Sequence, residues 1–176
     1  MFKFNFQDHY FKKAKKEGFK ARSAFKLEEL QEKFHLFDKK TKTIIDVGCA
    51  PGSRMQYAAN QMKKHKIADF TIIGFDLKDV NLNIPNVKTY VADITDEKKI
   101  KNILAENHIE KVDLIQSDMA PNTIGLKDID AIRLFELIDS MKRMIKDLLK
   151  PDGKFVMKLF MGPGFEEFVR EMKKEF

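Results

Sequence analysis

The chain has 176 residues, of which 43% are hydrophobic, and it carries a formal net charge of +6, which suits one globular domain and excludes a disordered protein. No apolar run approaches the roughly 20 residues of a membrane helix, and the opening segment MFKFNFQDHY lacks the apolar core of a secretory signal. One Cys, and four His without zinc-ligand spacing, lead us to expect a monomer without metal or membrane contact, in the cytoplasm or another reducing compartment.

Positive charge is concentrated at the start of the chain. Residues 1–42 hold 12 Lys and Arg against 6 Asp and Glu, whereas residues 43–176 hold 21 of each. Phe25, Leu27, Leu30 and Phe34 form an apolar stripe at helical spacing, and Gly18 predicts a break between two helical pieces. A phosphate backbone is a natural partner of this basic segment, but a solvated, Lys-rich helix face fits the charge equally well. The candidate RNA contacts are Lys12, Lys13, Lys15, Lys16, Lys20 and Arg22.

From residue 43 onward, predicted strands alternate with predicted helices. Apolar runs predict strands at 43–47, 70–75, 87–91, 112–115 and 154–160. Helical patterns cover 53–66, 95–108, 128–149 and 164–175, and a Pro-Asp-Gly segment at 151–153 should separate the third helix from the last strand. This alternation implies a mostly parallel α/β sheet with helices on both faces, which binds ligands where its strand order reverses.

A glycine-rich loop, Asp46–Gly52 (DVGCAPG), follows the first strand and opens a helix. Gly48 permits a tight turn, and Gly52 lets the backbone approach a ligand closely. Asp76 ends the second strand, where a carboxylate can accept hydrogen bonds from both hydroxyls of a ribose. Asp93 ends the third strand, where an adenine amino group could be bound. The pattern therefore predicts an adenosine-type site.

A nicotinamide-dinucleotide site has similar spacing, and two features argue against it. Ala50 and Pro51 interrupt the Gly-x-Gly-x-x-Gly pattern, and Pro51 removes a backbone N–H that a pyrophosphate would use. Asp46 favours a cationic ligand group over a diphosphate. A structural joint with incidental acids is the other alternative. Cys49 has no local base, so we interpret it as a packing residue.

Three further polar residues are not needed to build a core, namely Lys26, Asp118 and Lys158. Lys158 lies in the apolar run Val156–Phe160, which we expect to be buried, so its charge should be paired or functional. The alternative is a lysine that extends from a strand end into solvent. Asp118 ends the neighbouring strand, which favours function.

Taken together, these motifs resemble the FtsJ-type RNA 2′-O-ribose methyltransferases, and within them the enzymes of large-subunit ribosomal RNA. The resemblance covers Asp8 to Phe176, through the motifs Ala21–Leu27, Asp46–Gly52, Ser117–Asn122 and Lys158–Phe165. It implies a single Rossmann-like class I methyltransferase domain, spanning 1–176. Residues 1–42 would be a basic RNA-binding extension, and residues 43–176 would bind S-adenosylmethionine without a metal.

The family uses a Lys-Asp-Lys-Glu tetrad, whose first three members correspond to Lys26, Asp118 and Lys158. The resemblance implies that Lys158 takes the proton of a ribose 2′-hydroxyl, that Lys26 and burial disfavour protonation of Lys158, and that Asp118 positions it. The expected cofactor contacts are Asp46, Gly48, Pro51, Gly52, Arg54, Asp76, Asp93 and Asp118.

The sequence departs from the family pattern in two places. Arg54 stands where the family commonly has an aromatic residue. The tetrad Glu would follow Phe176, and the family's last two strands are missing, which would leave the strand at 154–160 as an open edge. We expect cofactor binding to survive, because its contacts lie on the first four strands.

Four functions are compatible with these features. A ribose methyltransferase of ribosomal RNA leads, and Met119–Asn122 and Gly162–Phe165 favour it. A transfer-RNA or cap methyltransferase on the same scaffold follows, because Ala21–Leu27 suits it too. A non-catalytic remnant that binds RNA or cofactor is third, and a nicotinamide oxidoreductase is a distant fourth.

Overall fold

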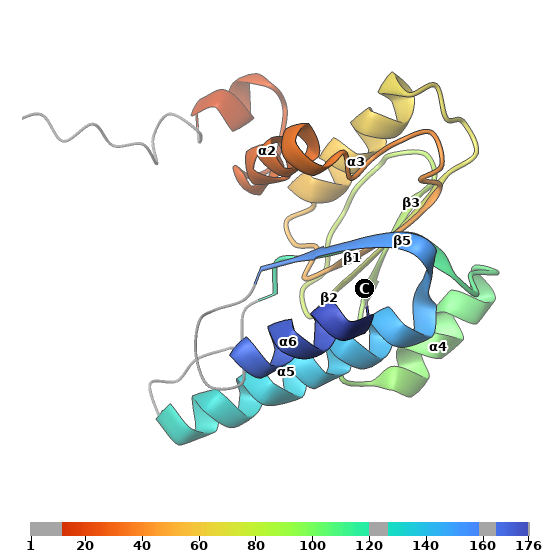
Figure 1. Ribbon diagram of the computed structural model, residues 1–176. Coiled ribbons are helices and arrows are strands. Elements are labelled where there is room, and N and C mark those ends of the chain that lie inside the picture. The colour runs from red at the N-terminus through yellow and green to blue at the C-terminus, as the bar shows by residue number, and fades with distance from the viewer. Residues whose placement is uncertain (1–11, 120–126, 159–164, 176) are drawn as a thin grey trace, which may run out of the picture.

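Figure 1 shows the computed structural model of the protein, which describes residues 12–119, 127–158 and 165–175. Residues 12–16 are helical, and Gly18, with φ of +76°, separates them from the next helix, as predicted. The elements that follow are α2 (Ser23–Phe34), β1 (Thr43–Val47), α3 (Ser53–Lys64), β2 (Thr71–Asp76), β3 (Val87–Val91), α4 (Glu97–Glu106), β4 (Val112–Ser117), α5 (Lys127–Leu148), β5 (Leu149–Met157) and α6 (Phe165–Glu175).

The five strands form one parallel sheet in the order β3-β2-β1-β4-β5. The chain builds outward from β1 through β2 to β3, and then crosses to the other side of β1 for β4 and β5. This reversal places the carboxyl ends of β1 and β4 side by side, at the kind of switch point where open α/β sheets bind ligands. The predicted α/β class with a parallel sheet is confirmed.

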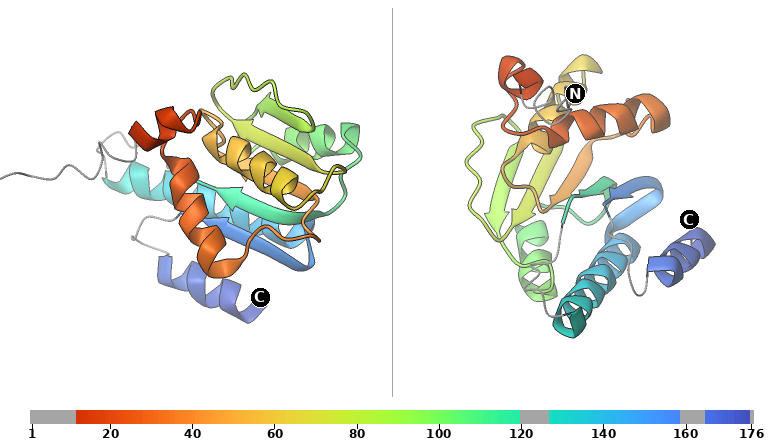
Figure 2. Two further views of the ribbon diagram at one scale, coloured as in Figure 1. Left: turned by 90° about the horizontal axis from the view of Figure 1, so that it is seen from above. Right: turned by 90° about the vertical axis from the view of Figure 1, so that its left-hand side faces the viewer.

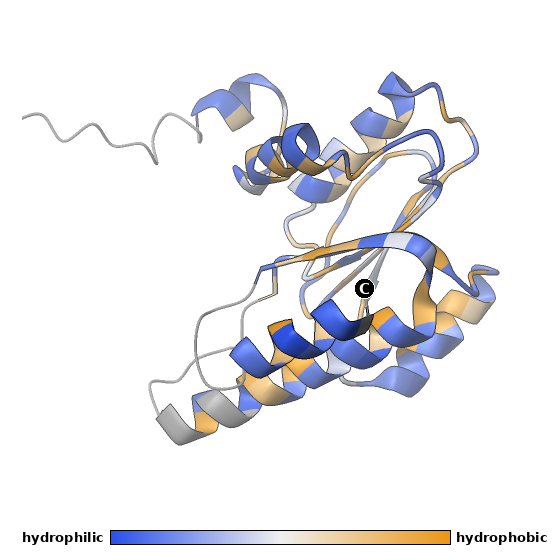
Figure 3. Ribbon diagram, in the orientation of Figure 1, coloured by the Kyte–Doolittle hydropathy of each residue, from blue (hydrophilic) through white to orange (hydrophobic). Residues whose placement is uncertain are grey.

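Helices cover both faces of the sheet. α2 and α3 lie on one face, and α4, α5 and α6 lie on the other (Figure 2). Successive strand residues point to opposite faces, so Ile44 of β1 packs with Met55 and Met62 of α3, whereas Ile45 packs with Met141 of α5. Strands buried on both faces are mostly apolar, as the buried isoleucines of β1 and β2 illustrate (Ile44, Ile45, Ile72 and Ile73), and Figure 3 shows apolar segments beside polar ones along the sheet.

The start of β5 differs from the prediction. The sequence suggested a break at 151–153, but β5 begins directly after α5. Leu149 pairs with Val112 and Lys154 pairs with Leu114, so four residues of β5 face a single residue of β4. A β-bulge absorbs the turn-forming segment, and the strand continues through it.

The end of β5 differs as well. β5 stops at Met157, and residues 159–160, which were expected to continue it, lie outside the described residues. The side chain of Lys158 is 50% exposed, so the expectation of a buried lysine within a strand is wrong. The amide of Lys158 donates to the carbonyl of Ser117 (2.9 Å), which keeps Lys158 beside the end of β4. In the part of the chain that the structure describes, β5 pairs with β4 alone and forms an edge.

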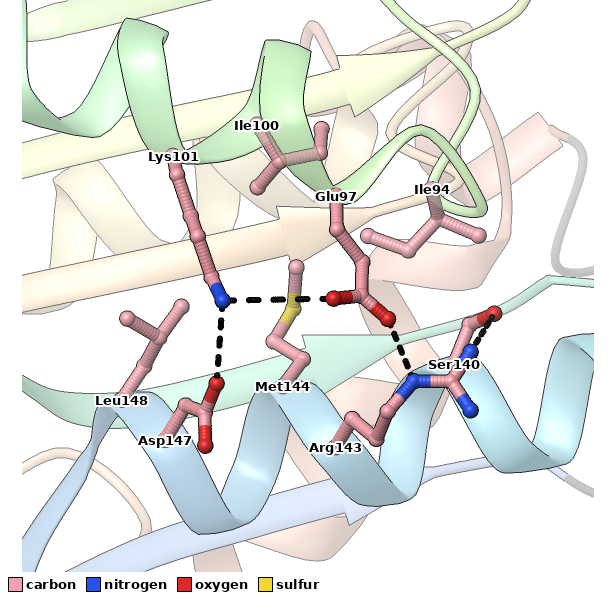
Figure 4. A pocket seen from close by; sticks show the side chains of 9 residues that line it. All are labelled: Ile94, Glu97, Ile100, Lys101, Ser140, Arg143, Met144, Asp147 and Leu148. Carbon is pink, nitrogen blue, oxygen red and sulfur yellow. Dashed lines mark hydrogen bonds and ion pairs between the residues drawn. The ribbon is translucent and has the colours of Figure 1, made fainter.

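Five charged side chains between α4 and α5 form a surface cluster, which we call the α4–α5 network, and Figure 4 draws all of them except Asp139. Arg143 pairs with both Glu97 and Asp139, and the ammonium of Lys101 lies 3.4 Å from Asp147 and 3.9 Å from Glu97. All five side chains are 44–60% exposed. Beneath them lie the apolar side chains of Ile94, Ile100, Met144 and Leu148.

Two classes of feature are not found among the described residues. No helix in these ranges is long and apolar enough to cross a membrane. No group of three or more His, Cys, Asp or Glu within the same ranges is arranged to hold a metal ion.

Candidate active site

The glycine-rich loop folds over the carboxyl end of β1 and is tied to β2. The amide of Gly48 donates to the carbonyl of Phe75 (2.8 Å), and the amide of Ala50 donates to Asp76 Oδ2 (2.8 Å). Gly48 has φ of +69°, and a Cβ at this position would lie 3.0 Å from the Met119 side chain. Both the backbone conformation and the available space therefore require glycine here.

A cavity of about 290 Å³ lies between this loop and the ends of β2, β3 and β4, and we call it the loop cavity. Asp76, Asp93 and Asp118 bring carboxylates to it from the ends of these three strands. Its apolar lining comes from Val47, Phe75, Leu77, Ala92, Ile94, Met119 and Leu137. Hydrogen-bond acceptors at the rim of an apolar slot suit a flat ligand that carries hydroxyl and amino groups.

A second cavity, of about 330 Å³, lies between α2 and the ends of β4 and β5, and we call it the α2–β5 cavity. Its apolar walls are Leu27, Leu30, Val156 and Met157, and its polar lining comprises Ser23, Lys26, Arg54, Gln116, Ser117, Asp118 and Lys158. Within the described ranges, Asp118 is the one residue that lines both cavities. A group bound in one cavity would therefore meet a group bound in the other beside this carboxylate.

Four side chains form a line of alternating charge through this junction, which we call the ionic chain: Asp46, Arg54, Asp118 and Lys158. Arg54 Nη2 pairs with Asp46 Oδ1, and Arg54 Nη1 lies 3.2 Å from Asp118 Oδ2. The other oxygen of Asp118 lies 3.2 Å from Lys158 Nζ. Side-chain exposure rises along the line, from 0% at Asp46 and 8% at Arg54 to 34% at Asp118 and 50% at Lys158. The ionic chain therefore runs from the buried core to the surface of the α2–β5 cavity.

The buried end of the ionic chain differs from the sequence expectation. Asp46 was expected to face a cationic ligand group, but the cation that it meets is the protein's own Arg54. Burial raises the pKa of Asp46, and the neighbouring guanidinium opposes that shift. The guanidinium also donates to the carbonyl oxygens of Gly48 (2.8 Å) and Val47 (3.2 Å), so it fastens the glycine-rich loop from below.

Among the predicted catalytic residues, Asp118 and Lys158 are paired directly. Lys26 of α2 lines the same cavity, but its side chain is 74% exposed and its ammonium pairs with Glu29 of the same helix at 2.9 Å. All three residues therefore line one cavity, but the ion pair of Lys26 is with a residue of its own helix, α2.

The predicted cofactor residues divide into two groups. Gly48, Asp76, Asp93 and Asp118 line the loop cavity. Asp46 is buried beneath the loop, and Arg54 lines the α2–β5 cavity. Gly52 packs against the Leu82 side chain, which would lie 2.7 Å from a Cβ added at this glycine. Pro51, like Gly52, is not among the residues that line the loop cavity. Motif residues 120–122 and 159–164 lie outside the described residues.

Two features of the site were missed from the sequence. Gln116 of β4 is 1% exposed and lines the α2–β5 cavity, and its side chain lies close enough to the buried Asp46 to counter part of the rise that burial causes in the pKa of that carboxyl. A polar residue within an apolar strand was the available signal. The hydroxyls of Ser23 and Ser53 lie 2.7 Å apart and join the first turns of α2 and α3. No local pattern pairs two serines 30 positions apart.

The interpretation of Cys49 as a packing residue is supported. The side chain is buried, and burial, followed by the charges of Asp46 and Asp76, raises the pKa of its thiol to about 12. A nucleophilic cysteine needs the opposite shift.

The predicted RNA-binding residues are mostly on the surface. Lys12, Lys15, Lys16, Lys20 and Arg22 are exposed, although Lys20 Nζ donates to the carbonyl of Asn81 (2.6 Å). Lys13 is half-buried, lies 3.2 Å from Glu28 and stands 4.3 Å above the centre of the Phe25 ring. Lys13 therefore helps to attach residues 12–16 to α2.

Comparison with known proteins agrees with this architecture. A model of the FtsJ-like methyltransferase family matches residues 19–176. The "Ribosomal RNA large subunit methyltransferase E" of Bdellovibrio bacteriovorus is 38% identical over 174 residues, which cover 98% of this chain and 86% of that protein. Its namesake in Methanothrix thermoacetophila is 35% identical over 170 residues, and there the match covers 97% of this chain but only 63% of the relative.

A solved structure of a similar protein shares this fold. The crystal structure of a Plasmodium falciparum protein, provisionally named a ribosomal RNA methyltransferase, superposes with a TM-score of 0.73 at 32% identity, covering 89% of this chain and 86% of that one. With a family match over most of its length and several relatives above 30% identity, the chain belongs to the FtsJ-like methyltransferase family.

Proposed function

We propose that this protein is an S-adenosylmethionine-dependent RNA 2′-O-ribose methyltransferase that acts on large-subunit ribosomal RNA. The observation that carries the proposal is the position of Asp118, which lines both cavities and pairs with Lys158. A methyl donor in the loop cavity and a ribose in the α2–β5 cavity would meet beside that pair.

The loop cavity fits the cofactor by its chemistry. Asp76 and Asp93 can accept hydrogen bonds from ribose hydroxyls and an adenine amino group, while Phe75, Leu77 and Ile94 offer apolar surface to the purine. The absence of a side chain at Gly48 keeps the loop close to Met119. When bound, S-adenosylmethionine supplies an electrophilic methyl group on a positively charged sulfur.

Lys158 is the proposed general base. Its amine, in the neutral form, would accept the proton of the 2′-hydroxyl. The oxygen would then form its bond to the methyl carbon as the carbon–sulfur bond breaks, with the electron pair of that bond retained by sulfur. Asp118 holds the amine in place through the 3.2 Å contact. Lys26 brings a second amine to the wall of the same cavity. Holding the hydroxyl in line with the methyl group should account for much of the rate.

Residues 1–42 are proposed to bind the RNA backbone. The exposed basic residues between 12 and 22 precede α2, and α2 carries Lys26 into the α2–β5 cavity. Phosphates held by this segment would direct a nearby ribose toward Lys158. Large-subunit ribosomal RNA is the proposed substrate because two relatives above 30% identity carry that name.

Transfer of a labelled methyl group tests the proposal. The protein is incubated with methyl-labelled S-adenosylmethionine and large ribosomal subunits, free ribosomal RNA or transfer RNA, and digested nucleosides are identified. We expect 2′-O-methylated nucleosides in ribosomal RNA, and a loss of about 10²–10⁴-fold in kcat for Lys158→Met.

The matched control is Lys101→Met. Lys101 is 60% exposed and lies 3.4 Å from Asp147, whereas Lys158 is 50% exposed and lies 3.2 Å from Asp118. The control should retain wild-type activity. Label on a base, label in transfer RNA alone, or equal activity of the two variants would contradict the substrate or the role of Lys158. Cofactor binding without transfer to any RNA would identify a non-catalytic protein.

A further inference from the structure

Arg54 joins the two ends of the active site, and it does so through one planar group. Its Nη2 contacts Asp46 under the glycine-rich loop, and its Nη1 contacts Asp118 at the junction of the cavities. We propose that Arg54 is a positioning residue, which orients the Asp118 carboxylate toward Lys158 and couples that pair to the glycine-rich loop. This inference rests on the proposed function.

The first step in the argument is that the guanidinium is itself fixed. Besides its contact with Asp46, Nη2 donates to the carbonyl oxygens of Gly48 and Val47, at 2.8 and 3.2 Å. Because the guanidinium is planar and rigid, these contacts also determine where Nη1 points. Nη1 meets Asp118 Oδ2, which leaves Oδ1 for the ammonium of Lys158.

The second step concerns charge. In the ionic chain the Arg54 guanidinium lies between two carboxylates, and Lys158 contacts the outer one. Removal of Arg54 would leave Asp46 buried without its cation and would free Asp118 Oδ2. Asp118 could then rotate or approach other donors, and the amine of Lys158 would lose a fixed position. A displacement of about 1 Å in a catalytic group can cost about 10²-fold in rate.

The third step separates positioning from cofactor binding. Arg54 lines the α2–β5 cavity and is not among the residues that line the loop cavity. Its loss should therefore lower kcat much more than the affinity for S-adenosylmethionine, which it can affect only indirectly, through the loop and Asp118. A residue that contacted the cofactor directly would show the reverse pattern.

Kinetics of three variants test the proposal. Arg54→Met should lower kcat by about 10²-fold, with cofactor affinity, measured by calorimetry, within about threefold of wild type. Arg54→Lys should recover part of the loss, because an ammonium can reach one carboxylate but cannot fork between two. The matched control is Arg143→Met, since Arg143 also pairs with two carboxylates, Glu97 and Asp139, on an exposed surface. It should keep wild-type kcat.

Arg54→Met leaves the buried carboxylate of Asp46 without its cation, which destabilises the fold. The double variant Asp46→Asn with Arg54→Met removes both buried charges and should restore folding. Its kcat should remain low, since Asp118 still lacks its partner. Recovery of wild-type kcat in this folded double variant would overturn the proposal, as would a loss of cofactor affinity in Arg54→Met with unchanged kcat.

A double-mutant cycle provides a readout that does not depend on turnover. Unfolding is measured for Arg54→Met, Asp118→Asn and their combination, and the two effects should be strongly non-additive. The pair Arg143→Met with Asp118→Asn should be additive. If wild type transfers no methyl group but the first cycle is non-additive, the proposed function fails and the Arg54–Asp118 coupling stands. An additive first cycle refutes the coupling whatever the activity.

Discussion

The ionic chain and the α4–α5 network share one arrangement, an arginine between two carboxylates, one of which also contacts a lysine. In the α4–α5 network the lysine contacts one further carboxylate, Asp147. The two groups differ in their surroundings. In the α4–α5 network every side chain is at least 44% exposed, whereas Asp46 and Arg54 are 0% and 8% exposed. Water screens the charges of the α4–α5 network, but it is excluded from Asp46 and Arg54 in the ionic chain. Burial, rather than composition, therefore separates a candidate active site from an ordinary charged surface.

Loss of a buried carboxylate should give the largest change in stability. Asp46→Ala removes the partner of Arg54 in a region without solvent, so we expect the free energy of unfolding to fall by about 3 kcal/mol or more. Urea unfolding followed by circular dichroism measures the change. The control is Asp139→Ala, because Asp139 also pairs with an arginine but is 58% exposed. Equal losses in the two variants would break the comparison.

Asp113 represents an intermediate case, with a side chain that is 17% exposed. It is the residue of β4 that faces the bulge in β5, and it accepts hydrogen bonds from the amides of Lys42 (2.9 Å) and Thr43 (2.8 Å) and from Lys150 Nζ (2.8 Å). Burial works in the other direction, but the Lys150 ammonium and the two amides hold the pKa of Asp113 below its usual 3.8. Asp113→Asn should lower the free energy of unfolding at pH 7 by about 1.5–3 kcal/mol.

The pH dependence of this effect follows from the sign of the shift. A carboxyl whose pKa is depressed by folding stabilises the protein fully above its unfolded pKa and loses that contribution as the pH falls through the folded value. The difference between wild type and Asp113→Asn should be constant from pH 7 to 5 and shrink below 3.8. The matched variant Asp69→Asn, whose side chain is 98% exposed and lies 3.7 Å from Lys42, should show little difference at any pH. A difference for Asp113→Asn that is as large at pH 3 as at pH 7 would contradict the assignment.

The sequence predicts those parts of the molecule that depend on local pattern. Apolar runs and helical stripes predicted that five strands exist and that their sheet is parallel, most securely for the central strands β1 and β2, which are buried on both faces. The acids at strand ends located the loop cavity, because parallel strands end at the same edge of the sheet. Gly48 was recognised from its position in the loop, where a positive φ is needed.

The rest of the site depends on contacts between distant residues. Arg54 could be noticed as a departure from the family pattern, but its partners Asp46 and Asp118 are brought together only by the pairing of β1 with β4. Lys158 was placed inside a buried strand because the surrounding residues are apolar, whereas the bulge and the end of β5 leave it half-exposed. The Pro-Asp-Gly segment was interpreted as a break because a local pattern does not reveal that a neighbouring strand can accommodate a bulge.

Loss of a charge from the α4–α5 network should have the smallest effect. Glu97→Gln removes the contact with Arg143 and weakens the one with Lys101, but both pairs are exposed and solvent already screens them. Helix α4 should remain attached through Ile100, Ile103 and Leu104, which are buried in the core cluster that includes α5. We expect an unchanged urea midpoint at 0.5 M salt and at most a slight fall at low salt, since the Debye length shortens with ionic strength. The decisive comparison is Ile103→Ala, which should destabilise the protein equally at both salt concentrations. A larger loss for Glu97→Gln than for Ile103→Ala would mean that charge, and not apolar contact, holds α4 in place, and the contrast between the two ionic groups would no longer rest on burial.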